Sequence, residues 1–536
     1  MRRGLLFPAL LLLAGCTFPS VPAGTQAPAP ATSTPATSTP AGSATPTGAG
    51  SVTVSPVEGT AIDRPTPAPV QVTPKGYVDA PTGTGLSGYL DQRLRWSNCG
   101  GTAVCADVVA PLDYADPGAQ ALTLSLKKLP ATAAPRLGTL FINPGGPGGS
   151  GKELVDSFSR TGLEQYDIVG WDPRGTGDST PVRCYDSARA DAMNDLDASP
   201  DTEQERTALL QATAEFADSC WEHSGDLLNH ISTIETVRDL DLLRRLVDDD
   251  RLHFLGYSYG TQIGATYAEL FPDKVGRVVL DAAVNISDDD AVIQAMGFDL
   301  ALGNFAQWCG EEACVLGGSK DEVLATITGL WDDLESAPLA VGDRQLTQTH
   351  AVLGVAALLY SGRTAWPALV AYVQKALQHE GRPLLWAADQ LNDRGDGGTY
   401  GSMFYAFPAI SCLDDTTDRG VLAADREWVE DQQKAPIFGR YFGPDYGCAL
   451  WPVRPAPALD IRGAGAAPIV VVGGTGDNAT PYQQAVEMAD QLESAVLVTY
   501  QGEGHGSFGG KSSCVDALVV AYLVKGTVPQ DGVRCS

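Results

Sequence analysis

Gly256-Tyr257-Ser258-Tyr259-Gly260 decides how this chain is expected to fold. The apolar stretch His253-Phe254-Leu255 precedes it, and an Ala-rich stretch that reads as a helix, residues 263–270, follows it. A serine in Gly-x-Ser-x-Gly between a strand and a helix is typical of a nucleophile elbow, a strained turn that exposes the hydroxyl above the end of a parallel sheet. Small residues are needed two positions on either side because the turn is so tight. We therefore predict that Ser258 is a nucleophile.

Apolar stretches of strand length recur on both sides of the elbow. We predict strands at residues 104–112, 121–129, 138–143, 166–172, 277–281, 468–473 and 495–500. Segments with helical character separate several of them, at residues 232–246, 482–492 and 515–524. Strands that alternate with helices predict an α/β fold class, with a mostly parallel central sheet flanked by helices.

The alternation stops between residues 286 and 460, where apolar residues recur at helical spacing. Val323 and Ile327, for example, fall on one face of such a segment. We predict a large helical cap at residues 286–460, inserted before the strand that precedes Asp477 and packed over the carboxyl end of the sheet. The core would then consist of residues 76–285 and residues 461–536.

One of the six histidines has the surroundings expected of a catalytic base. His505 lies between two glycines just past one predicted strand, and Asp477 lies just past the preceding one. The others lie in a strand or in helical or polar surroundings: His223, His230, His253, His350 and His379. The order Ser, Asp, His is the order in which the triad follows such an elbow. We predict that His505 removes the Ser258 proton and that Asp477 orients the imidazole.

A glycine-rich loop, Pro144-Gly145-Gly146-Pro147-Gly148-Gly149-Ser150-Gly151, follows the predicted strand at 138–143. A phosphate-binding loop would end in Gly-Lys-Ser/Thr or contain Gly-x-Gly-x-x-Gly, and neither pattern fits here. A purely structural loop is a second alternative. The third is an oxyanion loop, whose N–H groups face a developing negative oxygen. In that hypothesis the N–H of Tyr259 and that of Gly145 or Gly146 form the oxyanion hole.

Charged residues near the predicted sheet are expected to be structural. Asp172 and Arg174 follow the strand at 166–172, and we expect them to form an internal ion pair. On the predicted helix 232–246 the apolar residues form one face, so Asp239 and Asp241 would face solvent.

Five segments taken together carry a family resemblance: Asn143 to Gly151, Gly170 to Gly177, Gly256 to Thr261, Asp477 to Pro481 and Gly504 to Gly506. They resemble the bacterial tripeptidyl aminopeptidase family, which is related to the proline iminopeptidases within the α/β-hydrolase fold. The resemblance covers residues 85–536. It implies a secreted serine exopeptidase that removes short N-terminal pieces from peptides, with the cap closing the site around the free amine.

The resemblance brings no matching motif for an amine-binding site in the cap. Four acids there have the right charge for this role: Glu311, Glu312, Asp414 and Asp415. Each is equally compatible with a solvated or structural role. The expected partners are peptide substrates with a free N-terminus.

The chain begins with an export signal. Met1-Arg2-Arg3 and the apolar run from Leu5 to Ala14 form a secretory signal, too short to span a bilayer. Leu13-Ala14-Gly15-Cys16 resembles the bacterial lipobox, so we predict a lipoprotein signal at residues 1–16 and lipidation of Cys16; an ordinary signal peptide with a chance cysteine is the alternative. Residues 17–75 are rich in Pro, Thr, Ser and Ala and predict a disordered linker to the membrane surface.

Composition excludes some functions and indicates an oxidising compartment. Lys and Arg number 36 against 65 Asp and Glu, a net charge of −29, which argues against a nucleic-acid partner. Ten cysteines besides Cys16 in an exported chain indicate disulfides. Pairing neighbours in sequence predicts Cys99–Cys105, Cys184–Cys220, Cys309–Cys314, Cys412–Cys448 and Cys514–Cys535. No Cys-x-x-Cys or closely spaced His ligands occur, so we predict no metal and no cofactor.

Three functions remain in view. The first is an exported, lipid-anchored serine aminopeptidase that acts on short peptides. The second is a carboxylesterase or lipase on the same triad, because the elbow does not distinguish amides from esters. The third is a surface-binding lipoprotein whose hydrolase site has lapsed, against which the intact Ser258, Asp477 and His505 argue.

Overall fold

The computed structural model describes residues 73–287, 291–417 and 420–536. The predicted signal segment with Cys16, and the linker up to residue 72, lie outside these ranges. Within the described ranges no helix combines the length and apolar character needed to cross a membrane.

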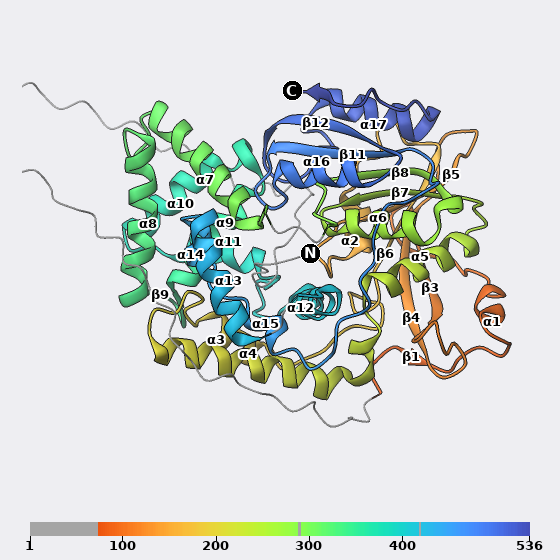
Figure 1. Ribbon diagram of the computed structural model, residues 1–536, viewed down its shortest axis with the longest axis horizontal. Coiled ribbons are helices and arrows are strands. Elements are labelled where there is room, and N and C mark those ends of the chain that lie inside the picture. Colours follow the sequence, from red (N-terminus) through yellow and green to blue (C-terminus); the bar gives the residue numbers. More distant parts are fainter. Residues whose placement is uncertain (1–72, 288–290, 418–419) are drawn as a thin grey trace, which may run out of the picture.

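An eleven-stranded sheet forms the core (Figure 1). Its main path runs in the order β13-β12-β11-β8-β7-β5-β6-β4-β3-β2, and β1 pairs with β4. The strands from β13 to β6 are parallel to one another, whereas β4, β3, β2 and β1 pair in antiparallel fashion. The sheet is therefore mostly parallel, as the sequence predicts. The strands are β1 (Tyr77–Val78), β2 (Ser97–Gly100), β3 (Ala103–Pro111), β4 (Ala121–Leu129), β5 (Gly138–Asn143), β6 (Tyr166–Trp171), β7 (Leu252–Tyr257), β8 (Val275–Asp281), β11 (Ile469–Gly476), β12 (Ala495–Glu503) and β13 (Val533–Cys535).

Helices cover both faces of the parallel strands. Successive residues of β5 point to opposite faces, so Leu140 and Ile142 pack in one apolar cluster and Phe141 packs in another. The first cluster includes residues of α2 (Gly151–Ser157) and α17 (Ser513–Lys525). The second includes residues of α5 (Thr233–Leu246), α6 (Tyr259–Leu270) and α16 (Tyr482–Gln491). Burial on both faces explains why these strands read as continuous apolar runs in the sequence.

A helical cap is inserted between β8 and β11 and lies beside the sheet (Figure 1). Many of its helices share an apolar core of their own, which contains Trp331 and Phe438. The cap elements are α7 (Gln294–Glu311), α8 (Lys320–Ser336), β9 (Leu339–Val341), β10 (Arg344–Leu346), α9 (Gln348–Leu359), α10 (Trp366–Leu377), α11 (Arg382–Leu391), α12 (Ser402–Asp414), α13 (Val421–Lys434), α14 (Phe438–Tyr441) and α15 (Tyr446–Ala449).

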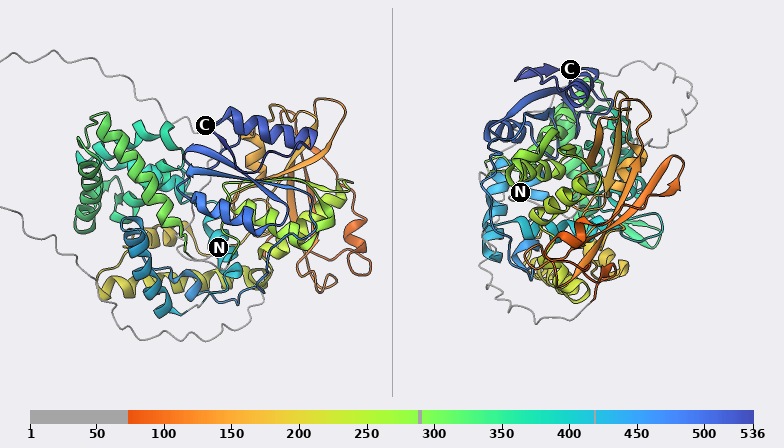
Figure 2. Two further views of the ribbon diagram at one scale, coloured as in Figure 1. Left: turned by 45° about the horizontal axis from the view of Figure 1, so that its top comes forward. Right: turned by 90° about the vertical axis from the view of Figure 1, so that its right-hand side faces the viewer.

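A segment from the first part of the chain packs with the cap. It contains α3 (Ser187–Asn194) and α4 (Glu203–Ser224), and α4 runs below both the core and the cap in Figures 1 and 2. Arg206 of α4 pairs with Asp425 of α13 at 2.6 Å. Asp191 of α3 pairs with Arg394, which follows α11, at 2.7 Å. These ion pairs tie the cap to a segment more than a hundred residues earlier in the chain.

The predicted ion pair between Asp172 and Arg174 is wrong. The Asp172 carboxylate accepts hydrogen bonds from the Ser150 hydroxyl and from backbone N–H groups, so its own turn already satisfies it. The Arg174 guanidinium instead reaches α5 and pairs with Asp239 at 2.7 Å. Asp239 and Asp241 are buried rather than solvated, because they lie on the side of α5 that packs against the core. Each is paired with an arginine there, Asp239 with Arg174 and Asp241 with Arg244.

All ten described cysteines form disulfides, with the five pairings that sequence proximity predicts. Cys412–Cys448 joins α12 to α15 within the cap. In the part of the chain that the structure describes, no group of three or more His, Cys, Asp or Glu side chains is arranged to hold a metal ion.

Candidate active site

Neighbouring parallel strands bring the predicted site residues to one end of the sheet. β12, β11, β8, β7 and β5 lie side by side in that order. His505 follows β12, Asp477 follows β11, Ser258 follows β7 and Gly145 follows β5. Because parallel strands have their carboxyl ends at the same edge, residues more than 300 positions apart in the chain meet there.

The turn at Ser258 has the geometry of a nucleophile elbow. Ser258 has φ 54° and ψ −125°, a conformation that is strained for a non-glycine residue, and it stands between β7 and α6. A Cβ at Gly256 would come 2.3 Å from the carbonyl oxygen of Gly260, and a Cβ at Gly260 would come 2.9 Å from the side chain of Asn143. The predicted need for small residues on both sides of the serine is thus confirmed.

His505 and Asp477 form a buried hydrogen-bonded pair. The ring Nδ1 of His505 lies 2.8 Å from Oδ1 and 3.0 Å from Oδ2 of Asp477. Burial alone would raise the pKa of Asp477, but the charge and hydrogen bond of His505 and the Thr480 N–H outweigh it and lower the pKa. The opposite ring nitrogen of His505, Nε2, is buried and makes no hydrogen bond to any described residue. This arrangement fixes the ring and leaves Nε2 available for a proton from a reacting hydroxyl.

The glycine-rich loop lies directly against the elbow. A Cβ at Gly145 would come 3.0 Å from the Cβ of Ser258 and 3.0 Å from the N of Tyr259. The N–H of Gly145 is already donated to Oδ1 of Asn143 at 2.9 Å. Tyr259 is the first residue of α6, where N–H groups have no acceptor within the helix. Of the two glycines considered for the oxyanion hole, the N–H of Gly145 thus already has an acceptor, which leaves Gly146 as the candidate to accompany Tyr259.

Cap elements enclose this end of the sheet. The ring of Tyr360, which follows α9, packs edge-on against the ring of His505 with centroids 5.4 Å apart, and its carbonyl accepts the His505 N–H at 2.9 Å. A Cβ at Gly297 of α7 would come 2.5 Å from the carbonyl oxygen of Asn478. A Cβ at Gly148 would come 2.9 Å from a side chain of α12. The end of the core that carries Ser258, Asp477 and His505 is thus in tight contact with α7, α9 and α12.

With this geometry in hand, comparison with known proteins identifies the family. A family model described as TAP-like protein matches residues 435–535. Serine protease Hip1 of Mycobacterium tuberculosis (strain ATCC 25618 / H37Rv) is 35% identical over 481 residues, which cover 83% of this chain and 91% of that protein. The tripeptidyl aminopeptidase of Streptomyces lividans is 31% identical over 453 residues, covering 81% and 83%. The chain belongs to the TAP-like family of α/β hydrolases. A third relative, carboxylesterase B of the same M. tuberculosis strain, is 35% identical over 466 residues and covers 81% of this chain and 86% of its own length.

Two of the four acids predicted to bind a substrate amine lie far from the contact between the cap and the Asp477 loop. Glu311 and Glu312 of the TAP-like protein are exposed at the end of α7. Gly297, where α7 touches the Asp477 loop, is 14 residues earlier, or about 20 Å along a helix. The two glutamates therefore lie far along α7 from its contact with the Asp477 loop. Charge alone favours these two glutamates in the sequence, which does not indicate which end of the helix faces the site.

Asp414 is closer to the elbow. It ends α12 and is only partly accessible, and its carboxylate accepts hydrogen bonds from the N–H of Thr233 at 2.9 Å and from the Thr233 hydroxyl at 2.5 Å. The same hydroxyl lies 2.6 Å from the Tyr259 hydroxyl. Burial raises the pKa of Asp414 to about 6, against the hydrogen bonds of Thr233. The neighbouring Asp415 carboxylate hydrogen-bonds Thr417.

Sequence reasoning missed two residues that contact the imidazole. Thr480 lies three positions after Asp477, and its hydroxyl is 3.3 Å from Nδ1 of His505. A hydroxyl in the turn after the acid could have been proposed from the sequence. Tyr360, in contrast, lies in a helical segment without any motif, and only the packing of the cap reveals it.

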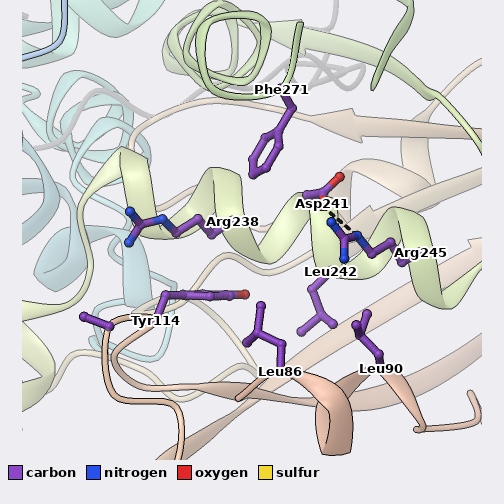
Figure 3. A pocket seen from close by; sticks show the side chains of 9 residues that line it. Leu86, Leu90, Tyr114, Arg238, Asp241, Leu242, Arg245 and Phe271 are labelled. Carbon is purple, nitrogen blue, oxygen red and sulfur yellow. Dashed lines mark ion pairs between the residues drawn. The ribbon is translucent and has the colours of Figure 1, made fainter. Parts of the chain in front are cut away.

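A pocket of about 310 Å³ lies elsewhere in the TAP-like protein, between α1 (Ser87–Leu90) and α5 (Figure 3). Leu86, Leu242 and Phe271 contribute apolar surface to it. Phe271 follows α6 at the end opposite to Ser258, about 18 Å along the helix. Arg245 at this pocket is already paired with Asp241 at 2.9 Å. The pocket therefore does not belong to the triad site.

Proposed function

We propose that this TAP-like protein is a serine aminopeptidase that removes short N-terminal pieces from peptides through an acyl-enzyme. The observation that carries the proposal is the strained Ser258 turn together with the buried His505–Asp477 pair, at the carboxyl ends of β7, β12 and β11 in one mostly parallel sheet. The relatives named serine protease and tripeptidyl aminopeptidase support a peptide substrate.

The chemistry follows from the roles of these groups. Ser258 Oγ attacks the peptide carbonyl while Nε2 of His505 takes its proton, and His505 then protonates the leaving amine. Asp477 holds the ring in the required tautomer and stabilises the imidazolium. The N–H groups of Tyr259 and Gly146 bind the oxyanion, and removal of one such donor typically costs about 3–4 kcal/mol of transition-state stabilisation. Water then attacks the acyl carbon while His505 takes its proton, and the bond to Ser258 Oγ breaks as His505 returns that proton to the serine.

Asp414 is the acid of the cap that we assign to the substrate amine. It is partly accessible, and its carboxylate accepts a hydrogen bond from the Thr233 hydroxyl. That hydroxyl also contacts the hydroxyl of Tyr259, the residue after the nucleophile. Above a pH of about 6 its carboxylate is ionised and can pair with an ammonium group.

An exported, lipid-anchored location completes the proposal. The apolar run to Ala14, the lipobox-like segment ending at Cys16 and the Pro-, Thr- and Ser-rich linker support it. Five disulfides in the described part of the chain are consistent with an oxidising compartment outside the cytosol. Metabolic labelling with an alkyne fatty acid tests it: the wild-type chain is expected to be labelled and Cys16→Ser is not.

A substrate panel tests the activity. We expect hydrolysis of tripeptide anilides with a free amine, loss of that hydrolysis when the amine is acetylated, and no turnover by Ser258→Ala. Equal turnover of free and acetylated substrates would contradict an aminopeptidase.

A carboxylesterase is the second candidate, favoured by the relative named carboxylesterase B. The same panel separates the two, because turnover of acyl esters without any turnover of peptide anilides would select the esterase. Mass spectrometry of products from a peptide mixture, with Ser258→Ala as control, would then show the length of the piece released.

A further inference from the structure

Asp281 links the elbow to the strand that leads to Asp477. It is the last residue of β8, which lies between β7 and β11, and it is fully buried. Its backbone carbonyl accepts the N–H of Ser258 at 3.0 Å. The next N–H in the chain, that of Ala282, is donated to the carbonyl of Val472 on β11 at 3.0 Å. The main chain at Asp281 therefore fixes the nucleophile turn against the neighbouring strands.

The side chain of Asp281 holds the loop that carries His505. Its Oδ2 accepts the N–H of Ser507 at 2.9 Å and the N–H of Phe508 at 2.7 Å, two and three residues after the histidine. Its Oδ1 is buried and has no hydrogen-bond partner among the described residues. No step of the proposed chemistry uses this carboxylate.

We propose that Asp281 is a positioning residue, whose backbone carbonyl fixes Ser258 and whose carboxylate fixes the His505 loop, so that one residue sets the distance between nucleophile and base. The inference rests on the proposed serine hydrolase chemistry. A misplacement of about 1 Å between reacting groups can slow a reaction about 100-fold, so such an anchor is worth retaining.

Burial disfavours the ionised form of the Asp281 carboxylate. Desolvation raises the pKa of Asp281 to about 6, the two N–H groups and the Lys511 charge oppose this rise, and the Asp477 charge adds to it. Lys511 also donates its ammonium to the carbonyl of His505 at 2.6 Å. On the β7 side the carboxylate faces the buried phenol of Tyr257. A neutral acid is a weaker acceptor, so the loop is held most firmly above a pH of about 6 and is loosened below it.

Labelling of Ser258 by a fluorophosphonate tests this inference without a peptide substrate. We expect Asp281→Ala to react about 10 to 100 times more slowly than the wild type at pH 8, with the fold checked by circular dichroism. Asp299→Ala is the matched control, because Asp299 also accepts two consecutive backbone N–H groups, those of Ile437 and Phe438, but in the cap. It is expected to label at the wild-type rate.

Asp281→Asn tests the charge and provides a second variant should Asp281→Ala fail to fold. The amide oxygen can still accept both N–H groups but, like the neutral acid, it is a weaker acceptor than the carboxylate, so we expect labelling at pH 8 at a rate between those of Asp281→Ala and the wild type. The part of the rate–pH profile that reflects protonation of Asp281 is expected to be absent from this variant, because no group titrates at position 281.

The outcomes separate this inference from the proposed function. If the wild type itself is not labelled, the hydrolase proposal fails. If the wild type is labelled and a folded Asp281→Ala, or Asp281→Asn where the alanine variant does not fold, reacts at the wild-type rate at pH 8, the positioning role of Asp281 is overturned.

Discussion

The carboxyl end of the sheet and the cap beside it are built on different principles. At the sheet end, backbone pairing of β12, β11, β8 and β7 fixes which residues become neighbours. Parallel strands lie about 4.8 Å apart, so a polar residue just past each strand is placed within reach of the next. In the cap, helices pack through apolar side chains around Trp331 and Phe438, and no repeating backbone contact fixes which polar groups face the site.

This difference separates the expected effects of substitution. Changes at the sheet end should affect the chemical step and leave the fold intact, because the strands keep their pairing. Changes in the cap should affect substrate binding or the stability of the cap.

Replacing the base should have the largest effect. His505→Ala removes the proton acceptor, and we expect kcat for any ester or anilide that the enzyme hydrolyses to fall by about five to six orders of magnitude. The thermal unfolding curve should remain close to that of the wild type. His379→Gln changes an exposed histidine of the cap and serves as the control. A residual rate of His505→Ala within 100-fold of the wild type would show that another group acts as the base.

Replacing the acid should rank next. Asp477→Asn keeps the shape of the side chain but not the carboxylate that accepts the Nδ1 proton, so we expect kcat to fall about 10⁴-fold. Steady-state kinetics at pH 8 measures it. A loss smaller than tenfold would mean that the imidazole is oriented by other contacts, such as the Thr480 hydroxyl.

The same contrast explains what the sequence predicts and what it does not. The strands, the elbow at Ser258 and the positions of Asp477 and His505 follow from short polar motifs that end apolar runs, because backbone pairing then places them. The sequence does not predict that Arg174 pairs with Asp239, because this pairing depends on how α5 packs against the turn after β6. The contact of Tyr360 with the imidazole depends on the path of several helices and leaves no local signal.

In the cap, the ion pair between Arg206 of α4 and Asp425 of α13 should affect the stability of the fold rather than the chemical step. Arg206→Ala leaves the Asp425 carboxylate without its 2.6 Å partner, and we expect a loss of about 3 kcal/mol in the free energy of unfolding. Chemical denaturation measures it. The kcat of the folded variant on an acyl ester is expected to be unchanged, and a fall of more than tenfold would show that this contact reaches the catalytic residues.

Asp414 should control substrate affinity with a defined pH dependence. Below a pH of about 6 the carboxyl is protonated and no longer pairs with an ammonium group, so KM for a free-amine tripeptide anilide should rise as the pH falls through that value. At pH 8, Asp414→Asn should raise this KM about tenfold and remove its pH dependence, with little change for an acyl ester. Asp415→Asn, one residue further along, is the control. An equal rise of KM for the ester would indicate a structural role instead.

The smallest effect is expected at the end of α7. Glu311→Gln and Glu312→Gln together remove two exposed charges about 20 Å along the helix from its contact with the Asp477 loop. We expect KM for free-amine peptides to stay within twofold of the wild type. A clear increase would mean that the substrate extends much further over the cap than the triad geometry implies.

The central claim is that four adjacent strands assemble one reactive serine with its own base. Peptide mapping after reaction with a fluorophosphonate tests it most directly. The account predicts one adduct per chain, located on Ser258, and almost none in His505→Ala at the same reaction time. An adduct on a different serine, or equal labelling of Ser258 without His505, would contradict it.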